Sequence, residues 1–245
     1  MIASTLLNQE MLLATLVTVI AGVVRGYTGF GSGLVMAPLL TLLWGPVEAI
    51  AITVAIGAAS FLQMGRAAAP LTRWREVMPI MAAALVVTPI GTYFLVTLDP
   101  DIVKRIIAGA VLAAALVSLW GWTYSGPRGV IPSFVAGAIG ALINGVAAVG
   151  GPPIVLYIMS LPEDAETHRA NIIWAVGVAG SMVLVTVAAA GALTGDTLLR
   201  VAILLLPMIA GVWLGGRIFA WLPGEAFRLI ILWMLVALSI SILVA

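Results

Sequence analysis

Arg25 and the glycines that follow it are the residues of this chain best suited to chemistry. The segment over 25–33 reads Arg25-Gly26-Tyr27-Thr28-Gly29-Phe30-Gly31-Ser32-Gly33 and lies within an apolar run. A glycine costs about 1 kcal/mol relative to alanine in a helix interior, so this segment predicts a broken helix. Inside a membrane, broken backbone persists only where protein or a water-filled cavity satisfies its polar groups. A charge at that depth faces a cavity or a partner, which makes Arg25 a candidate binding residue.

A second glycine-rich segment, over 144–153, reads Asn144-Gly145-Val146-Ala147-Ala148-Val149-Gly150-Gly151-Pro152-Pro153. A shift of 119 residues places Arg25 on Asn144 and Gly31-Ser32 on Gly150-Gly151. Broken helices at matching positions of two halves indicate the binding site of a secondary transporter.

Helices that begin inside a membrane can hold an anion. Their first N–H groups lack intrahelical partners, and the helix dipole adds partial positive charge. Glycine lets an oxyanion approach the backbone closely, and proline suits a first helical turn. Arg25 supplies a counter-charge and Asn144 supplies neutral donors. The substrate-binding candidates from the two segments are therefore Arg25, Thr28, Gly29, Gly31, Ser32, Gly33, Asn144, Gly150, Gly151 and Pro152.

The composition assigns the chain to the membrane. Of its 245 residues 63% are hydrophobic and 9% are charged, whereas soluble domains carry roughly 25% charged residues. The net charge of +1, without basic runs, indicates no nucleic-acid partner. The chain has no cysteine and a single histidine, His168, so we expect neither a metal centre nor a cofactor.

The apolar runs predict an all-α polytopic membrane protein with two inverted repeats. Runs over 47–65, 77–98 and 102–123 follow the first break, and runs over 170–192, 198–215 and 226–244 follow the second. We expect one integral membrane domain, with a first repeat over 1–124 and a second over 125–245. Each repeat would hold a broken helix or helical hairpin and three full transmembrane helices.

The loop cations bear on how the broken segments cross the membrane. If each segment crosses once, these cations divide evenly between the two sides. If each crosses twice, or enters and returns, the division becomes unequal, as expected for cytoplasmic loops. The second scheme predicts repeats of opposite topology and both termini outside. It puts Arg66, Arg73, Arg75, Arg128, Arg169, Arg217 and Arg228 on one side and Lys104, Arg105 and Arg200 on the other.

The paired glycine motifs resemble those of the TauE/SafE family of membrane proteins. The motifs are Gly26 to Gly33 followed by Pro38, and Asn144-Gly145 followed by Gly150 to Pro153. The order of apolar runs is similar to that family over nearly the whole chain. The resemblance implies an exporter in a bacterial-type inner membrane for sulfite, sulfoacetate or a related sulfur-containing anion. In this chain Ser32 replaces an expected glycine, and Ala148 stands where the first copy has Gly29.

Thr53, Asn171 and Trp174 are further candidates for lining the site. Thr53 and Asn171 lie on the helices that follow the two breaks, and Trp174 lies one turn beyond Asn171. Threonine and asparagine in membranes more often bond neighbouring helices, so a structural role is the preferred reading for Thr53 and Asn171. The spacing of Gly211 and Gly215 suits helix packing within the chain, with a homodimer as the alternative.

The leading prediction is a carrier that exports a small anion by alternating access. An anion channel with the same breaks as its filter is the first alternative. An intramembrane serine hydrolase using Ser32 is the second, but such a nucleophile needs a nearby general base. We expect His168 to lie in a cytoplasmic loop, away from Ser32, so the chain is not predicted to be an enzyme.

Overall fold

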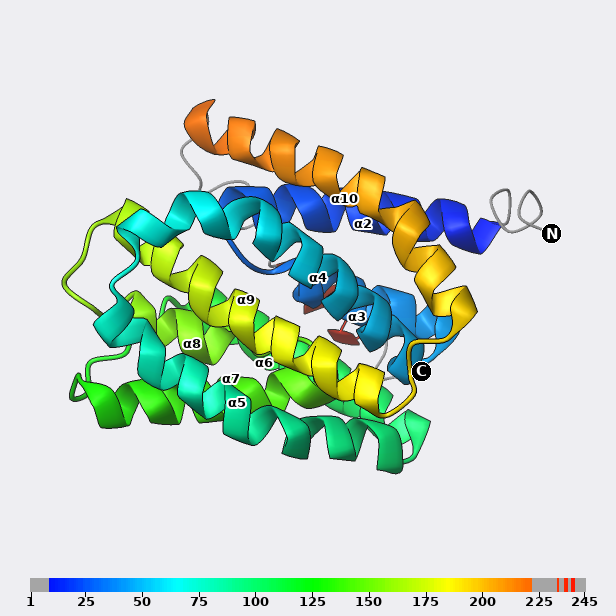
Figure 1. Ribbon diagram of the computed structural model, residues 1–245, viewed down its shortest axis with the longest axis horizontal. Coiled ribbons are helices and arrows are strands. Elements are labelled where there is room, and N and C mark those ends of the chain that lie inside the picture. Colours follow the sequence, from blue (N-terminus) through cyan, green and yellow to red (C-terminus); the bar gives the residue numbers. More distant parts are fainter. Residues whose placement is uncertain (1–8, 222–232, 234–235, 238, 241–245) are drawn as a thin grey trace.

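The computed structural model describes residues 9–221, 233, 236–237 and 239–240, and these residues form helices without strands. The elements run in the order α2 (Gln9–Thr28), α3 (Ser32–Trp44), α4 (Pro46–Ala68), η1 (Ala69–Leu71), α5 (Trp74–Thr97), α6 (Pro100–Trp120), α7 (Val130–Ala147), α8 (Gly151–Ile158), α9 (Ala165–Ala189) and α10 (Gly195–Trp221) (Figure 1). The predicted all-α class is confirmed. The predicted run over 226–244 lies almost entirely outside the described residues.

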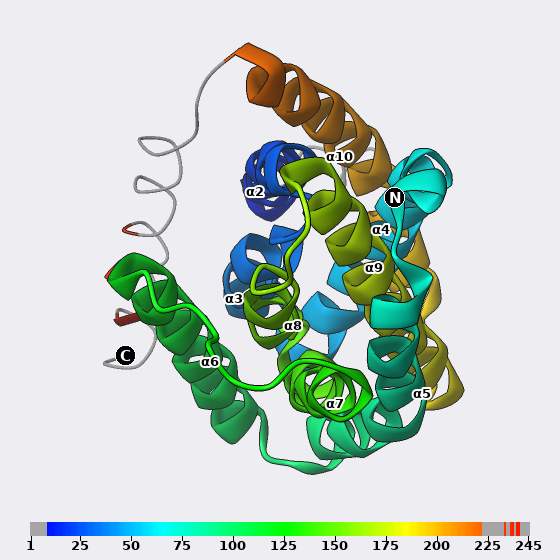
Figure 2. The ribbon, with the colours of Figure 1, turned by 90° about the vertical axis from the view of Figure 1, so that its left-hand side faces the viewer.

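Seven of the described helices are long and apolar enough to cross a membrane: α2, α4 with η1, α5, α6, α7, α9 and α10. The shorter α3 and α8 lie in the interior, between α2 on one side and α7 on the other (Figure 2). Many apolar side chains face outward, among them Leu62, Ile131 and Leu206, each more than 70% exposed. This apolar exterior is that of a multi-pass membrane protein, whose solvent is lipid.

Each broken segment is a helical hairpin that returns to the end of the molecule at which it began. The Trp44 indole at the end of α3 donates to Glu10, near the start of α2, at 3.2 Å. At the end of α8, the Tyr157 hydroxyl accepts from the Ser133 hydroxyl at 2.8 Å and from the Gly129 N–H at 3.1 Å. Because α7 begins just after Gly129, α8 has turned back along α7.

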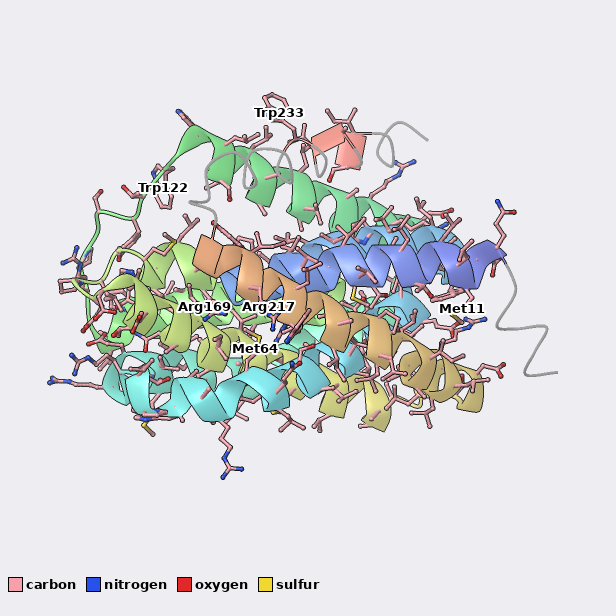
Figure 3. All side chains as sticks on the ribbon, turned by 90° about the horizontal axis from the view of Figure 1, so that it is seen from above. Met11, Met64, Trp122, Arg169, Arg217 and Trp233 are labelled. Atoms are coloured by element: carbon pink, nitrogen blue, oxygen red, sulfur yellow. The ribbon has the colours of Figure 1, made fainter. Side chains whose placement is uncertain are left out.

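Several described elements of the two predicted repeats correspond. The starts of α3 and α8 are 119 residues apart, and so are those of α4 and α9. The packing also corresponds, since α2 of the first half packs against α10 of the second, and α7 of the second against α5 of the first. Met11 in α2 and Trp122, ahead of α7, lie toward opposite ends of the molecule (Figure 3). The first helices of the two halves therefore start at opposite ends.

The interruptions are shorter than the sequence predicted. Helix α2 continues through Arg25 to Thr28, and only residues 29–31 separate it from α3. In this gap Gly29 and Gly31 have φ of 86° and 90°, which glycine adopts without strain. The second gap covers residues 148–150, where Ala148 has φ of 55°.

Candidate functional site

A cavity of about 40 Å³ lies where the two interruptions meet. One water needs roughly 10–15 Å³ on this measure, so the cavity has room for a few waters or one small ion. Elements of both halves form its wall, which consists of Arg25, Phe30, Gly31, Ser32, Gly33, Leu34, Thr53, Val54, Gly57, Asn144, Ala148, Val149, Gly151, Pro152, Val176, Gly177 and Gly180.

Arg25 is the one charged residue of this wall among the described residues. Its side chain is 5% exposed. One terminal nitrogen donates to the Ser32 hydroxyl at 3.1 Å, and the other donates to the Gly57 carbonyl at 3.2 Å. The Nε is buried without a hydrogen-bond partner among the described residues, and none of their carboxylates forms an ion pair with this guanidinium. Among the described residues, no side chain compensates the positive charge at the cavity.

The helix starts at the cavity have no side-chain caps. Gly31 precedes α3 and Gly150 precedes α8, and neither glycine offers a capping group. By contrast, α6 and α9 are preceded by Asp99 and Asp164, whose side chains accept hydrogen bonds from the first turn. The first N–H groups of α3 and α8 therefore have no side-chain cap, and N–H groups in this position can bind an anion.

The two helix starts contribute unequally. Ser32 and Gly33 each bring an N–H group to the first turn of α3. The first turn of α8 opens with Gly151, Pro152 and Pro153, and proline has no N–H. Gly151 is thus the one N–H donor among these three, so most backbone donors come from α3.

Two side chains are held so that their remaining donors are free. The Ser32 oxygen accepts from Arg25, which leaves the hydroxyl proton available. The Asn144 Oδ1 accepts from the Gly150 N–H at 3.2 Å, so its NH₂ group is directed away from that bond. Both residues line the cavity, and both are less than 7% exposed. Together with Arg25 they form a donor-rich, cationic site suited to an oxyanion.

The two interruptions also pack against each other. A Cβ on Gly33 would overlap the carbonyl oxygen of Ala148, and a Cβ on Gly151 would lie 3.1 Å from the Phe30 ring. Gly33 and Gly151 are thus small because the opposite half approaches closely.

The structure brings together eight of the predicted residues at the cavity: Arg25, Gly31, Ser32, Gly33, Thr53, Asn144, Gly151 and Pro152. Three others support the interruptions. The Thr28 hydroxyl accepts from the Phe30 N–H at 3.2 Å. Gly29 has positive φ and lies against Arg169. A Cβ on Gly150 would overlap the Gly140 carbonyl.

Asn171 and Trp174 lie outside the cavity wall. The Asn171 Oδ1 accepts from the Arg73 N–H at 2.8 Å, at the start of α5. The Trp174 indole donates to the Gly65 carbonyl at 3.1 Å and stacks edge-on with Phe61 and Trp74. In this structure both residues connect helices, which agrees with the structural reading of Asn171.

His168 lies in the first turn of α9, so its prediction as a loop residue is wrong. The Asp164 side chain caps this helix at 2.8 Å and makes it begin at Ala165. The imidazole Nε2 lies 3.0 Å from the Leu161 carbonyl, and His168 is absent from the cavity wall. The next residue, Arg169, donates to the Gly26 carbonyl at 2.9 Å. A cation near the C-terminal end of α2 interacts favourably with the negative end of the helix dipole.

Sequence reasoning missed the part of the wall formed by Gly57, Gly177 and Gly180. Gly57 accepts the Arg25 hydrogen bond through its carbonyl. These glycines lie within apolar helices, and glycine at such positions is the signal that could have marked them. It does not distinguish cavity glycines from packing glycines.

The model of the sulfite exporter TauE/SafE family matches residues 14–242. The chain belongs to the TauE/SafE family. No curated protein and no solved structure gave a match. The TauE/SafE match covers both hairpins and the cavity between them, so the resemblance in the glycine motifs is confirmed at the level of the family. The family match identifies the chain as a member of a family of membrane transporters.

Proposed function

We propose that the protein is a secondary transporter that exports a small sulfur-containing oxyanion, such as sulfite, sulfoacetate or a related sulfonate. The single observation that carries the proposal is the buried guanidinium of Arg25. It lies at a cavity lined by both halves, with no carboxylate ion-paired to it among the described residues. A bound anion supplies the missing counter-charge.

The neighbouring donors support the same assignment. Ser32, Asn144 and the uncapped starts of α3 and α8 surround the guanidinium with hydrogen-bond donors. Hydrogen bonds to charged groups contribute about 1.5–3 kcal/mol each, so a few such contacts hold an oxyanion at micromolar to millimolar affinity.

The proposed mechanism is alternating access by rocking of one half against the other. Each half contributes a hairpin whose interruption meets the cavity, and α4 and α9 pack against each other beside it. Such a movement would open the site first to one side of the inner membrane and then to the other. In this movement α3 would move together with α2, and α8 together with α7.

Efflux from proteoliposomes loaded with sulfite tests the proposal. We expect saturable efflux from the wild type, and at least about a tenfold loss in Arg25→Ala because the charge-assisted contacts disappear. Arg75→Ala, which removes an exposed arginine from α5, should retain wild-type efflux. The unfolding temperature of each variant shows whether it is folded.

Two results would contradict the proposal. Unchanged saturable flux in a folded Arg25→Ala variant would show that Arg25 does not bind the transported anion. Single-channel conductance in a planar bilayer would assign the chain to the anion channels instead of the carriers.

A further inference from the structure

We infer that the cavity takes its anion in a singly charged form that carries a proton, and that Thr53 accepts the hydrogen bond from that proton. This inference rests on the proposed function and narrows its substrate class to oxyanions with one acidic centre, of which hydrogensulfite is the simplest.

The charge of the wall is the first argument. Arg25 contributes one positive charge, and among the described residues no aspartate, glutamate, lysine or histidine lines the cavity. A monoanion pairs with the guanidinium, whereas a dianion brings a second full negative charge that meets only the partial positive charges of the α3 and α8 starts in a low-dielectric interior. An unpaired buried charge is strongly unfavourable, so the wall selects monoanions.

The other titratable groups near the wall are bonded to partners outside it. On α9, the Arg169 guanidinium donates to the Gly26 carbonyl and His168 lies against the Leu161 carbonyl. The acidic side chains Glu48 and Glu163 are paired with Arg200 and Arg73, respectively. The wall segments from α2, α3, α4, α7, α8 and α9 contribute no titratable group besides Arg25.

The size of the cavity is the second argument. A volume of about 40 Å³ corresponds to roughly three waters. An anion with a single central atom and three or four oxygens fits this space. A longer sulfonate that also carries a carboxylate is too large for this volume and has two negative charges against the single charge of Arg25.

Thr53 is the third argument. Buried hydroxyls in these helices commonly donate to the carbonyl four residues earlier, as those of Thr18, Thr41 and Ser60 do. The Thr53 hydroxyl makes no such bond. It is buried at the cavity wall with no partner among the described residues.

Arg25 has no acceptor, and the Ser32 and Asn144 oxygens each already accept one hydrogen bond, which leaves each of them a single further lone pair. A hydroxyl oxygen accepts as well as donates. Thr53 is therefore the hydroxyl of the wall whose full accepting capacity remains free among the described residues, so we assign it the hydrogen bond from a protonated oxygen of the anion. It is a specificity-determining residue in this role.

Binding of three probes to the full chain purified in detergent tests the inference at about pH 6 and about pH 8. Sulfite loses its remaining proton between these values, methanesulfonate stays a monoanion without an O–H group, and sulfate stays a dianion. We expect the affinity for sulfite to fall at least about tenfold at the higher pH, and that for methanesulfonate to stay constant. Sulfate should bind at least about tenfold more weakly than methanesulfonate, which has the same number of heavy atoms.

Thr53 variants distinguish the contribution of the Thr53 hydroxyl to binding from that of the other residues of the site. At the lower pH, Thr53→Val should weaken sulfite binding about three- to tenfold and leave methanesulfonate binding unchanged. Thr53→Ser should bind both as the wild type does. Equal losses for both probes in Thr53→Val would overturn the role of Thr53.

The inference and the proposed function fail in different ways. Sulfite affinity that is constant or rises with pH, or sulfate binding as tight as methanesulfonate binding, would overturn the inference while the anion site stands. Absence of binding for all three probes, together with unchanged efflux in Arg25→Ala, would overturn both.

Discussion

Ala148 holds a backbone conformation that is unfavourable for its residue type. Its φ of 55° is in the left-handed region, and among the described residues it is the one non-glycine residue with positive φ. An L-residue pays roughly 1–2 kcal/mol there. Gly29, which lies 119 residues earlier, meets the same requirement with φ of 86° and without that cost. Both interruptions thus need one left-handed residue directly after the first helix of the hairpin.

We predict that Ala148→Gly stabilises the protein. Relief of the left-handed strain exceeds the added flexibility of glycine in the unfolded chain, so we expect a net gain of about 0.5–1 kcal/mol. The unfolding temperature in detergent measures the change. Ala147→Gly makes the same replacement at the last residue of α7, where glycine should cost about 1 kcal/mol. A lower unfolding temperature for Ala148→Gly than for the wild type would contradict the assignment.

The residues local to the interruptions could be predicted from the sequence, whereas Asn171 could not be placed. A shift of 119 residues sets Asn171 opposite Ile52, beside Thr53. The wall uses residues 53–57 of α4 but residues 176–180 of α9. The cavity therefore lies about one helical turn away from the symmetric position. A repeat in the sequence shows which two positions are equivalent. It does not show which of the two faces the cavity, because that depends on how the surrounding side chains pack.

Glycines determine how the helices of the two halves cross. Gly22 and Gly26 of α2 lie against Gly211 and Val212 of α10 so closely that a Cβ would meet backbone atoms. Gly91 and Gly145 bring α5 and α7 together in the same way. In the absence of a hydrophobic driving force between helices in lipid, such close backbone approach favours association. The prediction that Gly211 packs helices within the chain is confirmed.

Adjacent glycines on α10 give a matched test of this packing. A Cβ on Gly215 would overlap the carbonyl oxygen of Val23, whereas a Cβ on Gly216 would meet nothing within 4 Å. We predict that Gly215→Ala destabilises the protein by about 1–3 kcal/mol because α2 and α10 must separate. Gly216→Ala should be neutral or stabilising, since alanine favours a helix. Equal unfolding temperatures for the two variants would contradict the packing.

The same packing explains why the first interruption is shorter than the sequence predicted. Gly26 lies within α2, where it makes room for the Val212 backbone, and it does not break the helix. A glycine that bends the chain and a glycine that admits a neighbour are identical in sequence. The helices bounded by clear turn residues, such as α6 between Asp99 and Gly121, were predicted to within a few residues.

The whole molecule has ends of unequal charge, and its hairpins determine which residues share an end. One end holds the ends of α4 and α10 and the starts of α5, α7 and α9, and the other holds the starts of α2, α4, α6 and α10 (Figure 1). Arg200, at the second end, pairs with Glu48 at 2.6 Å and lies 4.4 Å from the centre of the Trp44 ring. Of the described cations, Arg66, Arg73, Arg75 and Arg128 lie at the first end and Lys104, Arg105 and Arg200 at the second, whereas Arg25 lines the cavity and Arg169 and Arg217 lie farther from the ends (Figure 3).

This division matches the scheme in which each broken segment enters and returns. Hydropathy could not decide between the schemes, because α2 is long enough to cross while α3, at about 20 Å, is not. The hydrogen bond between Trp44 and Glu10 decides it, since this bond places the end of α3 beside the start of α2.

We predict that the arginine-rich end faces the cytoplasm, as short cytoplasmic loops carry the excess of arginine and lysine. The chain has no cysteine, so single introduced thiols report exposure to each side. Ser125→Cys lies in the exposed loop before α7, and Gly195→Cys lies at the exposed start of α10, at the opposite end. A membrane-impermeant maleimide added to intact cells with a permeable outer envelope should label Gly195→Cys at once and Ser125→Cys only after the inner membrane is disrupted. The reverse order of labelling would invert the proposed orientation. Equal labelling of both thiols in intact cells would contradict the placement of these two loops on opposite sides of the membrane, and with it the hairpin topology.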